Sequence, residues 1–117
     1  MKRKVMEPIK IDDGKHTGII REIDERKEPY AYIDIGICFK QGDKEVMLKA
    51  SYPDIISSGS KLGKLIKRMG IIMEPGKDVE LDIMKDKAVE FVTIAEETER
   101  GTFAKVVQDS VKPVQAN

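Results

Sequence analysis

The segment from Tyr30 to Phe39 constrains the fold most, because its side chains alternate between two classes. Every second residue is apolar: Ala31, Ile33, Ile35, Ile37 and Phe39. The intervening set is Tyr30, Tyr32, Asp34, Gly36 and Cys38. A period of two rich in β-branched residues predicts a strand with one buried face. We expect the isoleucine row to face the core and the tyrosine row to face solvent.

A second strand, 44–52, is predicted to pair with this one through a Gly-containing hairpin connection, 40–43. Its inward residues are Val46, Leu48 and Ala50, and its outward residues are Glu45, Met47 and Lys49.

Three further strands are predicted over 16–26, 88–96 and 102–111. The first is expected to be bent or bulged, since Gly18 and the Ile19–Ile20 pair interrupt its alternation. Residues 97–101 are expected to form a polar hairpin loop between the last two strands.

One helix is predicted between Ser60 and Gly70. Its apolar stripe, at helical spacing, is Leu62, Leu65, Ile66 and Met69. Ser60 is the expected N-cap and Gly70 the expected stop. Gly63 lowers the intrinsic stability of the helix by about 1 kcal/mol relative to alanine, so packing must hold it.

The predicted order is therefore three strands, a helix and two strands, in a mainly β chain. This is the order of a five-stranded OB-fold-like Greek-key barrel with one helix between strands 3 and 4. A five-stranded sheet with a helix across one face gives the same order. The domain spans 14–113, with an N-terminal tail at 1–13 and a C-terminal tail at 114–117.

Charge is balanced overall, with 21 basic and 21 acidic residues, but it is segregated along the chain. Residues 40–70 carry 7 basic and 3 acidic side chains, a net charge of +4. Residues 71–99 carry 3 basic and 9 acidic side chains, a net charge of −6. The balance excludes a uniformly basic coat, yet it leaves room for a local basic groove.

Single-stranded nucleic acid requires cations for phosphates and flat side chains for bases. The stacking candidates are Tyr30, Tyr32 and Phe103, and the phosphate candidates are Lys49, Lys64, Lys67, Arg68 and Lys105. In the last strand, either Phe103 and Lys105 or Ala104 and Val106 point outward. The alternatives are cross-strand packing for the tyrosines, a core position for Phe103 and a solvated face for the helix cations.

No catalytic constellation is apparent, and we expect neither an enzyme nor a cofactor. Cys38 and His16 are the single cysteine and histidine of the chain. A nucleophile normally requires an oriented base, and metal centres require several ligands. The glycines of segment 59–65 have the wrong spacing for a phosphate-binding loop. No membrane span is expected, and a cytoplasmic location is the default.

The helix Ser60–Gly70, together with 87–92 and 101–104, resembles segments of small OB-fold single-stranded DNA-binding proteins of phage, prophage and archaeal replication modules. The resemblance covers residues 14–113 and implies single-stranded DNA binding by analogy. A non-enzymatic, sequence-tolerant module for single-stranded nucleic acid, DNA before RNA, is thus the leading hypothesis. The alternative is a protein-interaction or self-assembly module of a replication or phage-derived complex, acting as a homo-oligomer or with a replication protein.

Overall fold

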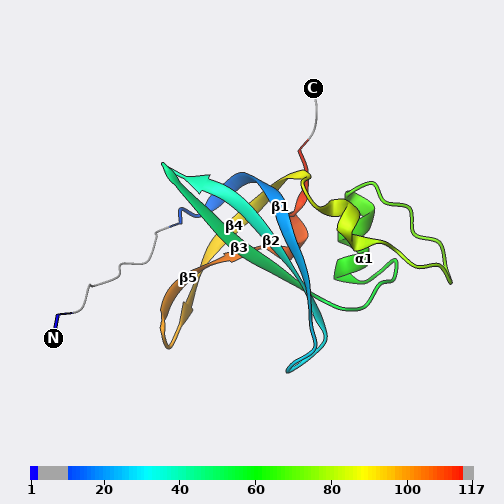
Figure 1. Cartoon of the computed structure of the whole chain (residues 1–117), viewed down its shortest axis with the longest axis horizontal. Helices are drawn as coiled ribbons and strands as arrows, with labels where there is room; N and C mark the ends of the chain where they lie inside the picture. Colours follow the sequence, from blue (N-terminus) through cyan, green and yellow to red (C-terminus); the bar gives the residue numbers. More distant parts are fainter. Residues whose placement is uncertain (3–10, 115–117) are drawn as a thin grey trace.

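A computed structural model describes residues 1–2 and 11–114 of the chain. Within them, the protein is mainly β, with one six-stranded antiparallel sheet and one α-helix (Figure 1). The strands are β1 (Gly14–Arg26), β2 (Tyr32–Gln41), β3 (Lys44–Pro53), β4 (Ala88–Thr98), β5 (Gly101–Val106) and β6 (Lys112–Pro113). The helices are α1 (Lys61–Arg68) and the short 3-10 turns η1 (Leu81–Met84) and η2 (Gln108–Ser110).

The long strand β1 organises the sheet, because its two halves pair with different neighbours. Gly14 to Ile19 pair with β4, and Ile19 to Arg26 pair with β2. The register with β2 shifts between Ile20 and Glu22, so β1 carries the predicted bulge. At this point the Ile20 amide donates to the Lys87 carbonyl, and the Ile20 carbonyl accepts from the Asp86 amide.

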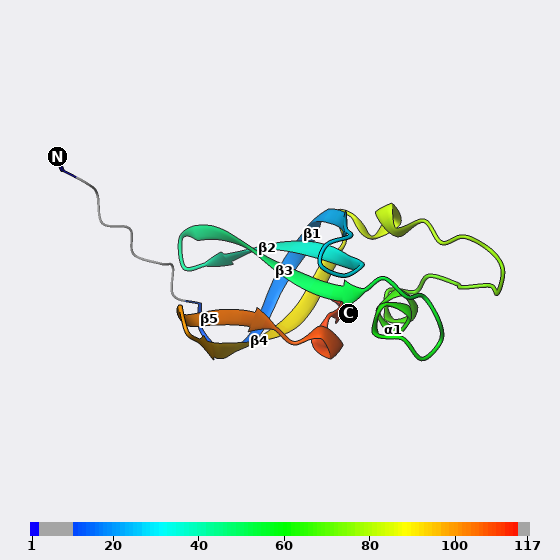
Figure 2. The ribbon, with the colours of Figure 1, turned by 90° about the horizontal axis from the view of Figure 1, so that it is seen from below.

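Strands β3 and β5 are the two ends of the hydrogen-bonded path β3-β2-β1-β4-β5. Because every pairing along this path is antiparallel, β3 and β5 run in the same direction. They converge near Gln108, whose Nε2 donates to the Ser51 carbonyl, while the Tyr52 hydroxyl donates to the Gln108 carbonyl (2.8 Å). Side chains therefore bridge β3 to η2, but no ladder pairs β3 with β5, and the barrel is not closed (Figure 2).

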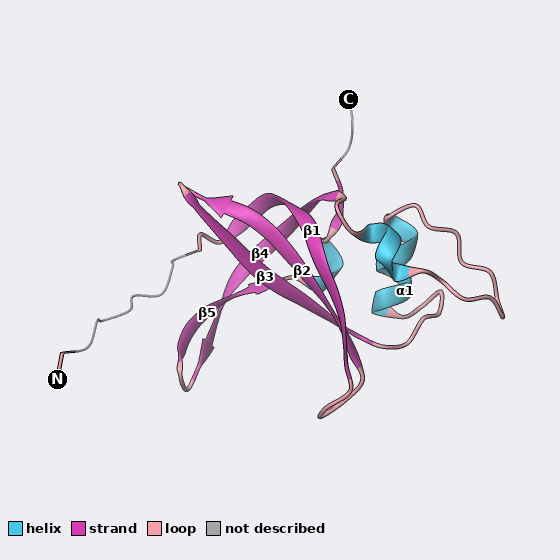
Figure 3. Cartoon of the chain, viewed as in Figure 1, coloured by secondary structure: helices cyan, strands magenta, loops and turns pink. Residues whose placement is uncertain are grey.

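Helix α1 packs at the end of the sheet where β3 and η2 meet (Figure 3). Ser60 caps it, accepting the Gly63 amide at 3.0 Å, and Gly70 follows with a positive φ of 81°. The stripe that faces the sheet is Leu62, Leu65, Ile66 and Met69, as predicted. The main sheet residues of the same core are Ile20, Ile33, Ile35, Ile37, Phe39, Ala50, Tyr52, Val89 and Phe91.

Every predicted strand differs from the observed one at one or both ends. β1 begins at Gly14 and β4 extends to Thr98, so the predicted loop 97–101 is reduced to residues 99–100. Two strands differ more. The strand predicted from Tyr30 begins at Tyr32, which leaves Ala31 exposed in a connection containing Pro29. The strand predicted over 102–111 stops at Val106. The Ser110 hydroxyl then accepts the Val92 amide (2.9 Å), so a side chain replaces the ladder where η2 interrupts it. The two-residue β6 resumes pairing with β4 and raises the number of strands to six.

His16, near the start of β1, packs against two aromatic rings of the core. Its half-buried ring lies 5.0 Å from the Phe39 ring and 5.5 Å from the Phe91 ring, between centroids. Its Nε2 lies 2.8 Å from the Asp12 carbonyl. Within the predicted tails, residues 3–10 and 115–117 lie outside the described residues.

Candidate nucleic-acid interface

The outer face of β1, β2 and β3 forms the centre of the candidate interface. Cross-strand pairing places Arg26, Tyr32 and Pro53 in one row. The next row is Asp24, Asp34 and Ser51, and the row after it is Glu22, Gly36 and Lys49. These three rows therefore hold one aromatic ring and two cations, but they also hold three carboxylates.

Asp34 anchors the charged groups of this face. It is buried, accepts a hydrogen bond from the Ser51 hydroxyl at 2.6 Å and lies 3.1 Å from Arg26 Nε. The Arg26 guanidinium carbon lies 4.9 Å from the centroid of the Tyr32 ring. Asp34 thus neutralises Arg26 and holds it over Tyr32 in a cation–π contact.

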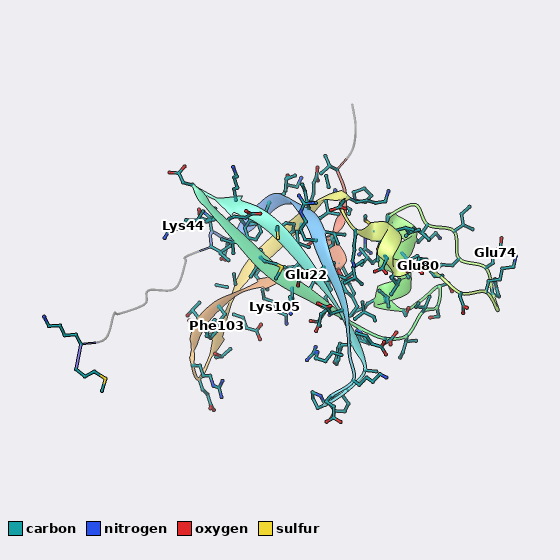
Figure 4. All side chains as sticks on the ribbon, in the orientation of Figure 1. Glu22, Lys44, Glu74, Glu80, Phe103 and Lys105 are labelled. Carbon is teal, nitrogen blue, oxygen red and sulfur yellow. The ribbon has the colours of Figure 1, made fainter. Side chains whose placement is uncertain are left out.

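Tyr30 lies in the β1–β2 loop (27–31), not on the strand face that the sequence predicted for it. Its side chain is 71% exposed. Phe103 lies on β5 opposite Glu96 and is 52% exposed. Val106 is buried, so Phe103 and Lys105 form the outward pair of β5 (Figure 4). The β1–β2 loop and the β4–β5 turn (99–100) project toward the same side of the molecule (Figure 1).

The cations near the convergence of β3 and β5 come from three elements. Lys49 lies on β3, two residues before Ser51, and Lys105 lies on β5, three residues before Gln108. Lys105 Nζ is 3.6 Å from Glu96, an exposed pair that contributes little to stability. Lys61 Nζ donates to Gln108 Oε1 at 2.8 Å, and Lys61 and Lys105 line a shallow hollow of about 220 Å³.

The helix cations are arranged differently. Lys64 and Lys67 are exposed on α1. Arg68 is half-buried, with Nε donating to the Val111 carbonyl at 2.8 Å and a terminal nitrogen donating to the Gln108 carbonyl at 3.3 Å. Arg68 therefore braces η2 and β6 against the helix.

Two cations at the candidate interface, Arg26 and Lys61, were missed from the sequence. The β1–β2 loop contained a usable signal, because a hairpin centred on Pro29 places the end of one strand opposite the start of the next, hence Arg26 opposite Tyr32. Lys61 had no such signal, since its position depends on Gln108, 47 residues further along the chain.

The single histidine, the single cysteine and the buried carboxylate of Asp34 lie in different surroundings. His16 packs with the aromatic rings of the core, while Asp34 is engaged on the outer face of the sheet. Cys38 is half-exposed on β2, paired in register with Met47. Among the residues that the structure describes, no group of three His, Cys, Asp or Glu side chains could hold a metal ion.

No protein-family model matches the sequence, and no curated protein matches it. In the described part of the chain, no helix combines the length and apolar character needed to cross a membrane.

Proposed function

We propose that this chain is a non-enzymatic OB-fold-like module that binds single-stranded nucleic acid, with DNA as the expected form. In this proposal β1 to β5 correspond to the five strands of an OB barrel, and α1 is the helix between strands 3 and 4. The kinship with phage, prophage and archaeal single-stranded DNA-binding proteins is part of the same proposal, as is a cytoplasmic location.

Aromatic exposure is the observation that supports this function most. The chain has only six aromatic residues, three Tyr and three Phe. Tyr52, Phe39 and Phe91 are buried, while Tyr30 and Phe103 are largely exposed and Tyr32 is partly exposed. Leaving scarce apolar rings in water sacrifices burial free energy, whereas exposed rings provide stacking surfaces for unpaired bases.

In the proposed mechanism, aromatic rings contact the bases and cationic side chains contact the phosphates. Tyr30, Tyr32 and Phe103 stack on bases. The phosphates are contacted by cations at three places: Lys49 and Lys105 near the convergence of β3 and β5, Lys61 beside them, and Lys64 and Lys67 on α1. Binding is sequence-tolerant and weakens with salt. The logarithm of the binding constant falls linearly with the logarithm of the salt concentration, with a slope of about −0.7 for each phosphate neutralised on a single strand.

Fluorescence anisotropy with a labelled oligothymidine tests this proposal at two salt concentrations. Tyr30→Ala and Phe103→Ala should each weaken binding about 5-fold to 150-fold, the range expected for about 1–3 kcal/mol per stacked base. Ile72→Ala, which truncates another exposed apolar side chain, is the matched control and should leave affinity unchanged. Absence of binding by the unaltered protein at low salt, or equal losses in all three variants, would contradict the proposal.

A protein-interaction module is the second candidate function. It is favoured by exposed isoleucines in the connections around α1: Ile55, Ile56, Ile72 and Ile83. These connections are separate from the outer face of β1 to β3, so one chain can carry both functions.

A further inference from the structure

A cleft separates the β3–α1 connection from the α1–β4 connection, with a volume of about 640 Å³. Its apolar lining comes from Ile56, Met73, Pro75 and Val79. Ile55 and Ile72, the chain neighbours of two lining residues, are 63% and 83% exposed. Exposed apolar side chains gathered beside a cleft are typical of a surface that another chain covers.

The surroundings of this cleft are acidic. Glu74 and Asp78 line it, and residues 74–82 carry four acidic side chains against one lysine. Glu74 is paired with Lys77 at 2.6 Å, whereas Asp78 has no ion pair with any described residue. Figure 4 shows Glu74 at the tip of the connection and Glu80 nearer α1, both far from Lys44 on the β2–β3 hairpin. An occupant of this cleft should therefore combine apolar and basic side chains.

The chain contains a segment with this chemistry. Residues 1–10 carry four basic side chains and one acidic side chain, together with Val5, Met6 and Ile9. The described chain continues at Ile11 beside the β2–β3 hairpin, where Gln41 donates to the Asp12 carboxylate at 3.0 Å. This is the end of the molecule opposite α1 (Figure 1).

We propose that the cleft binds the basic segment 2–10 of a second copy of this chain. The lysines and the arginine of the segment pair with the acidic rim, and its apolar side chains cover the cleft lining. Because the cleft lies at the opposite end of the molecule from Ile11, where the segment is attached, the contact is head-to-tail and joins copies into rings or open chains. The proposal does not depend on nucleic-acid binding.

Sedimentation velocity of the full-length protein without nucleic acid tests this contact. The unaltered protein should form oligomers at about 0.05 M salt that dissociate at about 0.5 M, because the Debye length shortens from over 10 Å to below 8 Å. One variant reverses the charge of the segment (Lys2→Glu, Arg3→Glu, Lys4→Glu), and another reverses the charge of the two carboxylates that line the cleft (Glu74→Lys, Asp78→Lys). Each alone should associate at least about tenfold more weakly, since like charges then meet.

Mixing the two variants provides the decisive measurement. The acidic segment of the first then meets the basic rim of the second, while the two unaltered surfaces also match, so association should return. Glu97→Lys with Glu99→Lys, at the β4–β5 turn, is the charge-matched control and should associate like the unaltered protein. A monomeric unaltered protein at low salt, undiminished association of either variant, or a mixture that stays monomeric would overturn the proposal.

Discussion

At the scale of single residues, Tyr52 has the most constrained side chain on the edge strand β3. It is 1% exposed, and its hydroxyl donates to the Gln108 carbonyl at 2.8 Å. Removing the hydroxyl in Tyr52→Phe should lower the free energy of unfolding by about 1 kcal/mol, the usual net value of one hydrogen bond. Urea denaturation measures this. Tyr32→Phe, on the outer face, is the control and should cost less than half as much.

The same residue predicts a pH dependence. Burial raises the pKa of the Tyr52 hydroxyl above its ordinary value of 10.0; Arg68 lowers it and Asp109 raises it further. Above pH 10 the unfolded chain releases this proton while the native protein retains it. Native stability therefore falls as pH rises, by up to about 1.4 kcal/mol per pH unit. The difference between the unaltered protein and Tyr52→Phe should be full at pH 7 and shrink between pH 10 and 11; a constant difference would contradict this.

Individual side chains divide into those that periodicity could place and those that it could not. The burial of Ile33, Ile35 and Ile37 follows from the alternation of β2 alone. Asp34 obeys the same alternation, yet it is buried on the outer face because Arg26 and Ser51 satisfy its carboxylate. That burial depends on partners from two other strands, which a linear pattern does not identify.

At the scale of elements, α1 shows how tertiary contacts override local propensity. Gly63 is a poor helix former, yet a Cβ at this position would collide with the Ser57 carbonyl. Gly63→Ala should therefore destabilise the protein by about 1–2 kcal/mol, although propensity alone predicts a gain of about 1 kcal/mol. Thermal or urea unfolding decides between the two signs. Lys64→Ala, at the adjacent exposed position, should change stability by less than about 0.5 kcal/mol.

The limits of the elements were predictable where a local signal exists. Ser60 and Gly70 bound the helix as expected, and the bulge in β1 follows from its interrupted alternation. The break after Val106 was missed because Val107 and Val111 continue an apolar pattern typical of a strand. Asp109 and Ser110 are residue types that favour turns. The turn replaces a continued strand here because the Ser110 hydroxyl accepts a hydrogen bond from the Val92 amide of β4, a contact that the sequence does not reveal.

At the scale of the whole molecule, the sheet bends until β3 and β5, the two ends of its hydrogen-bonded path, converge. Strand order follows from hairpins and from the divided pairing of β1. The convergence itself depends on Gln108, which contacts Ser51 on β3, Lys61 on α1 and the Tyr52 hydroxyl. Contacts separated by 47 to 57 residues leave no periodic trace in a sequence, which is why the degree of barrel closure could not be predicted.

Substitutions of Gln108 test whether its side-chain bond to Ser51 sets the spacing of β3 and β5. Gln108→Ala removes the side-chain link from η2 to Ser51 and should lower the free energy of unfolding by about 1–2 kcal/mol. Gln108→Glu keeps an acceptor for Lys61 and adds a negative charge beside it, but it loses the donor to the Ser51 carbonyl.

If the side-chain bond to Ser51 sets the spacing of β3 and β5, both variants should speed amide exchange at Val107 and weaken oligothymidine binding. Asp109→Ala, at the next exposed position, should do neither. If Gln108→Glu instead matched the unaltered protein in both measurements, the bond from Gln108 to Lys61, and not the side-chain bond from Gln108 to Ser51, would hold the two arms of the sheet together.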